Sequence, residues 1–122
     1  MIATAFFEVV SNQTIAPEVN HIRLKPIATT DFTFIPGQFI TLHFEKEGTR
    51  FRRSYSIASM PGIDQTVDFA ASYVEGGIAS AYLFALQVGD QVEVSGPFGR
   101  LILRDEPLDR LFLVATGTGI TP

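Results

Sequence analysis

The feature that most constrains the fold is a series of short segments in which apolar and polar residues alternate, each ended by a turn signal. In residues 91–95, for example, Val92 and Val94 are separated by Glu93. This period of two is typical of strands that are buried on one face. Pro36-Gly37 and Gly76-Gly77 are among the turn signals. Strands are predicted over residues 3–10, 19–25, 38–45, 50–58, 65–74, 91–95 and 101–103.

One segment predicts a helix. Residues 78–86 contain neither Gly nor Pro and are apolar on nearly every side, which indicates a short buried helix. Many short strands with turns between them, and a single helix, predict an all-β antiparallel barrel or sandwich. A chain of 122 residues with 46% hydrophobic residues and 11 Phe can bury a core of that kind.

Composition removes several classes of function. The net charge of −4 argues against general nucleic-acid binding. The lack of cysteine excludes disulfides and thiolate metal sites, and two histidines exclude a His-rich metal site. His21 and His43 are interpreted as surface residues of strands. No apolar run suits a signal peptide or a membrane span, so we expect no membrane partner and a cytoplasmic location.

The last residues break the antiparallel pattern. Residues 111–115 form a continuous apolar run, as expected for a parallel strand covered on both faces. The run leads into Gly117-Thr118-Gly119, and a strand feeding a Gly-rich loop is how a nucleotide-binding α/β unit begins. We therefore expect a barrel domain over residues 1–106. Residues 107–122 would be a linker and the first strand and loop of an incomplete second domain.

A candidate ligand site lies in residues 52–59. In a strand, Arg53 and Tyr55 share one face, and Ser56 lies on the other face or at the strand edge. A guanidinium suits phosphate, and a phenol offers a flat ring with a polar tip. A flat phosphorylated ligand such as a flavin nucleotide matches this set. The alternative is a solvated Arg53 beside a half-buried core Tyr55.

The start of the predicted helix is a second candidate. Gly76 and Gly77 precede Ile78, Ala79 and Ser80. Free N–H groups at a helix start attract phosphate, and glycine lets a ligand approach the backbone. The alternative is an ordinary loop entering a helix.

These pieces occur in an order that resembles the flavin-binding domain of the ferredoxin–NADP reductase superfamily. The resemblance spans nearly the whole chain and rests on five short motifs: Pro36-Gly37-Gln38-Phe39, Arg53–Ser59 (RSYSIAS), Gly77-Ile78-Ala79-Ser80, Gly89–Gly99 (GDQVEVSGPFG) and Ala115–Pro122 (ATGTGITP). It implies a six-stranded antiparallel Greek-key barrel with one small helix and FAD at its edge.

The resemblance also implies roles for residues. Arg53 would pair with the pyrophosphate, which the backbone of Gly77, Ile78, Ala79 and Ser80 would cradle. Tyr55 would lie against the isoalloxazine or bond the ribityl chain. Ser56 would hydrogen-bond near flavin N5, so Ser56 and Tyr55 are the catalytic candidates. Thr118 would reach the flavin where the nicotinamide arrives. Ser54 and Ser72 complete the cofactor-binding set. The family often has a basic residue near Ser72, and residues 71–74 have none.

The function implied is transfer of a hydride from NAD(P)H to flavin N5, followed by single electrons to ferredoxin, flavodoxin or another acceptor. The NAD(P)H-binding part would lie in the incomplete domain, so the 122-residue chain is expected to bind flavin with little or no turnover. Three alternatives stay open: a flavin-sensing or docking module without turnover, FMN in place of FAD, and a structural barrel without cofactor.

Overall fold

The structure is a computed structural model that describes residues 3–28, 31–62 and 64–122. The strands are β1 (Ala5–Ala16), β2 (Val19–Pro26), β3 (Phe39–Lys46), β4 (Thr49–Ser56), β5 (Val67–Ser72) and β6 (Gln91–Phe98). The helix α1 (Ile78–Ala85) precedes β6, and a 3₁₀ turn, η1 (Gly117–Ile120), lies near the C-terminus. All pairings are antiparallel in one sheet of order β4-β3-β6-β1-β2-β5. The six-stranded antiparallel prediction with one helix is therefore confirmed.

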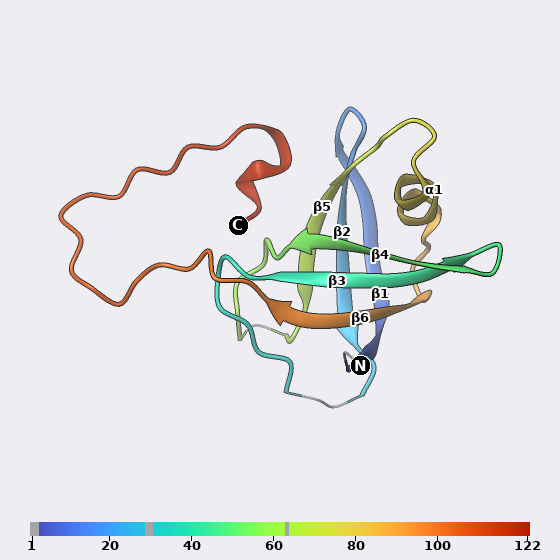
Figure 1. Cartoon of the computed structure of the whole chain (residues 1–122), viewed down its shortest axis with the longest axis horizontal. Coiled ribbons are helices and arrows are strands. Elements are labelled where there is room, and N and C mark those ends of the chain that lie inside the picture. Colours follow the sequence, from blue (N-terminus) through green and yellow to red (C-terminus); the bar gives the residue numbers. More distant parts are fainter. Residues whose placement is uncertain (1–2, 29–30, 63) are drawn as a thin grey trace.

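The sheet curls until its two end strands meet. β4 and β5 are the first and last strands in the sheet order and share no ladder. The Ala58 N–H nevertheless donates to the Asp68 carbonyl at 2.8 Å, and the rings of Tyr55 and Phe69 lie 4.9 Å apart. The result is a barrel that is closed at one end of the β4–β5 seam (Figure 1).

The core lies inside this barrel and follows the predicted alternation. Directly opposed residues on paired strands point to the same face, so each ladder buries one matched set of side chains. The fully buried side chains are Phe7, Val9, Ile22, Leu24, Ile40, Leu42, Val67, Phe69, Leu83, Val92 and Val94. Leu83 comes from α1, which lies beside the barrel (Figure 1).

β1 is longer than predicted. A break was expected after residue 10 because Ser11, Asn12 and Gln13 are polar, but the strand continues to Ala16. These residues pair with β2, with register shifts between Val9 and Ser11 and between Thr14 and Ala16. Polar residues remain in the strand because it projects beyond the apolar core. There the Asn12 side chain contacts α1 instead of solvent.

Two predictions near the end of the barrel are wrong. Residues 96–99 were expected to be a tight loop, but β6 continues to Phe98, which pairs with Phe39 across a register shift. Gly96, at φ +128°, accommodates this irregularity. The strand expected over residues 101–103 is absent. This segment instead runs over the Gly37 turn, so closely that a Cβ on Gly37 would lie 1.6 Å from the Leu101 carbonyl oxygen.

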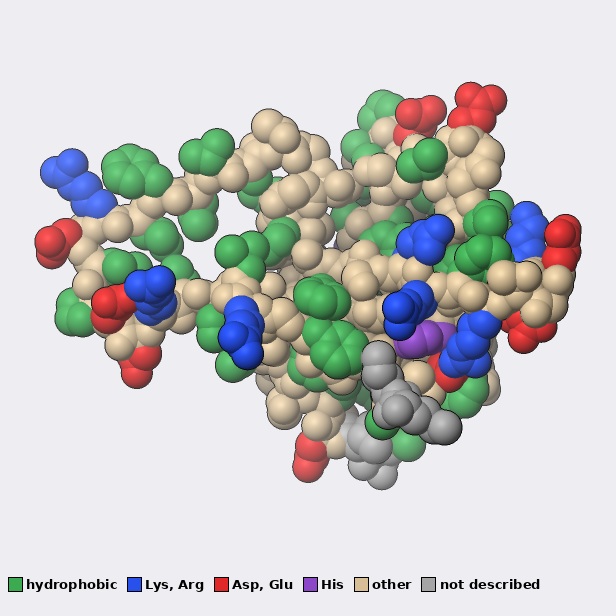
Figure 2. Space-filling model, viewed as in Figure 1, with side chains coloured by type: hydrophobic (Ala, Val, Ile, Leu, Met, Phe, Trp, Pro, Cys, Tyr) green, Lys and Arg blue, Asp and Glu red, His purple; other side chains and the backbone are tan. Residues whose placement is uncertain are grey.

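The strand expected over residues 111–115 is also absent. The segment from Arg100 onward leaves the barrel as an extended excursion (Figure 1), and Leu111 to Val114 are exposed. A strand that is covered on both faces needs neighbouring strands and layers, and the described part of the chain supplies none. Apolar side chains are scattered along this excursion in the space-filling view (Figure 2).

Candidate functional site

The barrel is open beside Arg53. Arg53 is paired with Leu42, Tyr55 with Ile40 and Phe51 with Phe44, so all three β4 residues share the inner face. Leu42 is buried, yet Arg53 is exposed. An exposed charge among inward-facing residues marks an opening in the barrel wall. The Tyr55–Phe69 contact lies at one end of this part of β4, and the rings of Phe51, Phe44 and Tyr82 link its other end to α1.

Backbone groups line the seam between β4 and β5. The Ile57 N–H points to β3, where it binds the Gln38 carbonyl, whereas the Ala58 N–H points to β5. Because this direction alternates along a strand, the backbone N–H and C=O groups of Ser54 and Ser56 also point across the seam. The carbonyl of Asp68 points toward β4, so the backbone of Ser72, four residues on, does the same. The seam therefore offers paired donors and acceptors for the edge of a flat polar ligand.

Tyr55 and Ser56 stand at the closed end of the seam. Tyr55 is half-buried against Phe69, and this burial raises the pKa of its phenol, opposed by the charge of Arg53. The phenol is thus a neutral hydrogen-bond donor at physiological pH. Ser56 is partly buried on the opposite face, and its hydroxyl has no hydrogen bond among the described residues. The Ser54 hydroxyl differs, because it is bonded to Thr41 Oγ1 at 2.9 Å, which leaves its backbone for a ligand.

Arg53 is free to bind an anion. Its Nη1 donates to the Arg52 carbonyl at 2.8 Å, and no carboxylate in the described ranges forms an ion pair with it. Lys and Arg side chains gather over the face formed by β3 and β4 (Figure 2), in contrast to the net charge of −4. This is the local positive field that a small phosphorylated ligand requires.

The start of α1 is uncapped. Its first helical hydrogen bond runs from the Ala81 N–H to the Gly77 carbonyl, so the N–H groups of Ile78, Ala79 and Ser80 have no intrahelical acceptor. No side chain caps Gly77, and the first turn contains no acidic residue. A Cβ on Gly77 would lie 2.9 Å from the Val74 carbonyl oxygen, so the tight 74–80 turn requires glycine here.

Ser80 has a role that the sequence did not predict. Its side chain is buried, and its Oγ accepts the Val74 N–H at 2.8 Å. The hydroxyl therefore holds the turn before α1, and the backbone N–H of Ser80 is the group that can face a ligand.

Two aromatic contacts link β4 to α1 through Phe44 of β3. The ring of Phe44 lies 4.4 Å from the ring of Tyr82 with an angle of 6° between their planes, and 5.8 Å from the ring of Phe51. Phe51 precedes Arg53 by two residues on the same face, and Tyr82 follows Ile78 by one helical turn. Through these rings α1 packs beside the β3–β4 hairpin, whose second strand carries Arg53 (Figure 1).

Thr118 approaches from the C-terminal segment. η1 contacts β5, the strand that carries Phe69, and Thr118 is partly buried there. The Thr118 carbonyl accepts the Thr121 N–H and hydroxyl. The predicted site residues thus lie on β4, on β5, at the start of α1 and on η1. The two histidines are engaged in other interactions.

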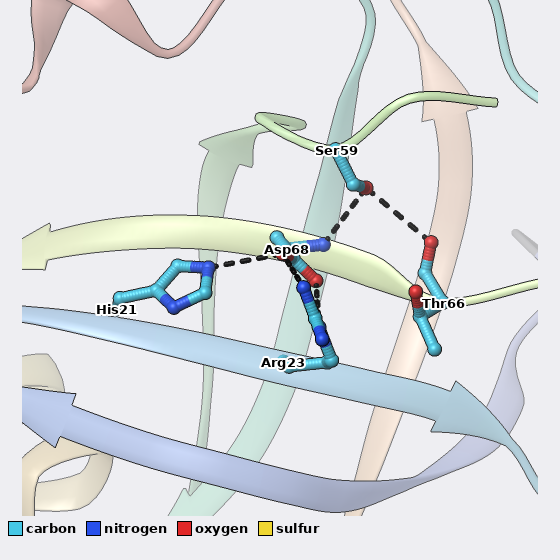
Figure 3. A network of polar contacts seen from close by, with 5 residues as sticks. All are labelled: His21, Arg23, Ser59, Thr66 and Asp68. Carbon is cyan, nitrogen blue, oxygen red and sulfur yellow. Dashed lines mark hydrogen bonds and ion pairs between the residues drawn. The ribbon is translucent and has the colours of Figure 1, made fainter. Parts of the chain in front are cut away.

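The buried ion pair behind the seam was missed. Asp68 accepts hydrogen bonds from Arg23 Nε at 2.8 Å and Arg23 Nη2 at 2.7 Å, and its Oδ2 lies 3.0 Å from His21 Nε2 (Figure 3). The Ser59 hydroxyl accepts the Asp68 N–H and donates to the Thr66 carbonyl. The cluster ties β2, β5 and the end of β4 together. The only sequence signal was an Asp in an otherwise apolar strand. The prediction that His21 lies at the surface of its strand is correct, but its partner Asp68 was not foreseen. His43 is bonded to Ser95 Oγ at 2.7 Å.

The stability of the domain should depend on pH through Asp68. Burial alone would raise the pKa of this carboxyl, but the hydrogen bonds and charges of Arg23 and His21 outweigh it and hold the pKa below its usual value. At acidic pH the unfolded chain binds this proton more readily than the folded one, so stability rises with pH. We expect the contribution to be complete above about pH 4 and to be lost as the pH falls through the lower folded pKa. Urea titrations between acidic and neutral pH measure it. A free energy of unfolding that stays constant over this pH range, in the unmodified chain and in Asp68→Asn alike, would contradict the prediction.

The family model described as "Oxidoreductase FAD-binding domain" matches residues 6–102. The chain belongs to the oxidoreductase FAD-binding domain family. This FAD-binding domain is 34% identical over 116 residues to the reductase component of propane 2-monooxygenase from Mycolicibacterium goodii, covering 94% of this chain and 33% of that protein. It is 38% identical over 115 residues to ferredoxin–NADP reductase B from Sorangium cellulosum, covering 93% and 46%.

A solved structure shows the same arrangement. The ferredoxin reductase in carbazole 1,9a-dioxygenase matches with a TM-score of 0.83 and 26% identity, over 98% of this chain and 37% of that one. The FAD-binding domain thus spans between about a third and half of the length of these relatives.

FAD fits the residues that are present. The unpaired guanidinium of Arg53 and the uncapped N–H groups of α1 match a diphosphate. The Tyr55 ring and the seam backbone match a flat ring system that carries donors and acceptors on its rim. No group of three or more potential metal ligands occurs among the described residues, and none of the helices described there is long and apolar enough to cross a membrane.

Proposed function

We propose that this domain holds the FAD of a flavin-dependent NAD(P)H oxidoreductase. In this proposal a further domain of the whole protein binds NAD(P)H, and residues 107–122 are the linker to that domain and its first part. The observation that carries the proposal is Arg53, an unpaired guanidinium at an opening in the barrel, beside the β4–β5 seam and on the same side as the uncapped start of α1. The relatives named as reductase components of oxygenase systems and as a ferredoxin–NADP reductase support it.

Each residue has a physical task in this proposal. Arg53 and the N–H groups of Ile78, Ala79 and Ser80 bind the diphosphate from two sides. Tyr55 packs against the flavin or donates to its ribityl chain, and the backbone of Ser54, Ser56 and Ser72 meets the rim of the ring. The Ser56 hydroxyl stands where it can hold a proton near N5. Bound FAD supplies hydride acceptance and one-electron transfer, and the protein supplies position and electrostatics.

The proposed partners are NAD(P)H and an electron acceptor such as ferredoxin, flavodoxin or an oxygenase component, in the cytoplasm. Thr118 would meet an approaching nicotinamide at the flavin, and the packing of η1 beside β5 supports this role. The isolated chain is expected to retain flavin and to show little NAD(P)H oxidation. Chromatography of the cofactor released by heat should identify FAD, and release of FMN alone would contradict the assignment.

Arg53→Ala should weaken FAD binding by about 10- to 100-fold, since a charged hydrogen bond contributes about 1.5–3 kcal/mol. Fluorescence titration of the apoprotein with FAD measures the change. Arg52→Ala is the matched control, because it removes the same charge from the adjacent position on the opposite face of β4. Arg52→Ala should change the affinity for FAD by no more than about threefold, because it removes only a long-range attraction that salt screens. Equal losses in the two variants would contradict a contact by Arg53, and no flavin binding by the unmodified chain would overturn the proposed function.

A further inference from the structure

The C-terminal end of α1 is held by a side chain from β1. Asn12 Nδ2 donates to the Leu83 carbonyl and to the Leu86 carbonyl, each at 2.9 Å. These carbonyls belong to the last turn of α1 and its C-cap, where backbone acceptors run short of helical N–H donors. The Leu83 carbonyl also accepts the Leu86 N–H, at a longer 3.3 Å. A residue 71 positions away in sequence thus adds two hydrogen bonds to the one local bond that ends the helix.

Two further side chains fix the orientation of the Asn12 amide. Asn20 Nδ2 donates to Asn12 Oδ1 at 2.9 Å, and Thr14 Oγ1 donates to Asn20 Oδ1 at 2.9 Å. Asn20 is 94% buried, so its hydrogen bonds have little competition from water. Because Asn12 Oδ1 is used by Asn20, the Asn12 nitrogen is the atom that faces α1.

The other contacts of the helix are mostly apolar, and they include the ring pairs Phe44–Tyr82 and Tyr73–Phe84. The helix is 8 residues long, has no side-chain N-cap, and has no basic residue in its last turn. Its two buried residues are Leu83 and Ser80, and Ser80 Oγ accepts the Val74 N–H at 2.8 Å. A helix this short is marginal by itself and takes its direction from tertiary contacts. Its polar anchors are therefore Ser80 near the start and Asn12 at the end.

We propose that Asn12 is a positioning residue for the diphosphate of FAD. This inference rests on the proposed function, in which the N–H groups of Ile78, Ala79 and Ser80 meet the diphosphate. Those bonds form only within about 2.7–3.2 Å, so a small tilt of α1 weakens them. Asn12 acts at the opposite end of the helix, about 12 Å away at 1.5 Å per residue. It sets the helix direction without touching the ligand.

Asn12→Asp tests this inference in the complete 122-residue chain. Aspartate keeps the shape and the acceptor for Asn20, but it replaces the donor with an anionic oxygen facing the carbonyls of Leu83 and Leu86. The FAD dissociation constant should rise by about tenfold. In amide NMR spectra, the shifts that FAD induces at residues 78–80 should be lost, whereas those at Tyr55 and Ser56 should persist. A role in stability alone would weaken both sets together.

Thr14→Val is the matched control. It breaks the same network at its far end, where Thr14 contacts Asn20 but not α1. It should lower thermal stability and leave FAD affinity within about twofold of the unmodified chain, because both Asn12 bonds to the helix remain. Asn12→Ser, which is neutral and retains a donor, should fall between Asn12→Asp and the unmodified chain.

Four outcomes would overturn the inference. In the first, Asn12→Asp binds FAD as well as the unmodified chain. In the second, Thr14→Val loses affinity equally. In the third, both Asn12 variants are unfolded, so that Asn12 serves the fold alone. In the fourth, FAD shifts only β4 resonances in the unmodified chain, which would remove this role and leave the FAD assignment intact. If the unmodified chain binds no FAD, the proposed function fails together with the inference.

Discussion

Replacing Phe69 with alanine should lower the free energy of unfolding by about 3–5 kcal/mol, the cost of removing a fully buried phenyl ring and leaving a cavity. Phe69 is 0% exposed and is paired with Ile22, which is also fully buried. Its ring is also the surface against which Tyr55 packs. The variant should therefore also weaken FAD binding, since Tyr55 loses the contact that fixes its ring beside the seam.

Phe6→Ala is the matched control for this prediction. Phe6 lies on β1 with 55% of its surface exposed, so the same truncation removes little buried area. Its cost should stay below about 1 kcal/mol. Chemical denaturation followed by circular dichroism measures both variants. A cost for Phe69→Ala no greater than that for Phe6→Ala would show that the β4–β5 contact is not part of the stable core.

Asp68→Asn should lower the free energy of unfolding by about 2–4 kcal/mol. The change removes the charge and one acceptor from a carboxylate that is 8% exposed, binds Arg23 through two nitrogens and contacts His21. The loss falls below the upper range for buried pairs because Arg23 is 45% exposed and can be hydrated when its partner is gone. The acid-dependent part of the stability should disappear with it.

Glu93→Gln is the comparison for Asp68→Asn. Glu93 binds Arg50 at 2.7 Å and Thr4 at 2.7 Å, but the Arg50 side chain is 60% exposed. An ion pair of this kind contributes between about 0 and 1 kcal/mol. Equal losses in the two variants would contradict the view that burial of Asp68 determines the strength of its cluster. Urea unfolding at neutral pH measures both.

The alternation of residues along each strand was sufficient to predict most of the barrel. Val92 and Val94, or Ile22 and Leu24, are buried because a period of two places them on one face whatever the strand pairs with. The strand predictions failed where the presence or absence of a neighbouring strand determines whether a segment becomes a strand. Residues 11–14 are polar yet form a strand because β2 lies opposite them, and residues 111–115 are apolar yet form none.

The candidate site was predicted as a set of residues and not as an arrangement. Arg53, Tyr55 and the Gly77–Ser80 turn were indicated by side-chain chemistry and by their order along the chain. Their grouping depends on the curl of the sheet, which brings β4 to β5, and on the stacked rings of Phe44 and Tyr82, which bring α1 to β3 beside β4. Neither contact follows from spacing, because each joins residues that are distant in sequence.

By itself the sequence determined which segments become strands, which faces they bury and which side chains can meet a diphosphate, because these properties depend on local periodicity and side-chain chemistry. Only the tertiary structure decided that an exposed guanidinium lies at an opening in the barrel and that Ser80 Oγ is already bonded to the turn. It also decided that Asp68 and Asn12 hold separate elements together. Those facts depend on which residues meet across the fold, and burial gives such contacts their strength.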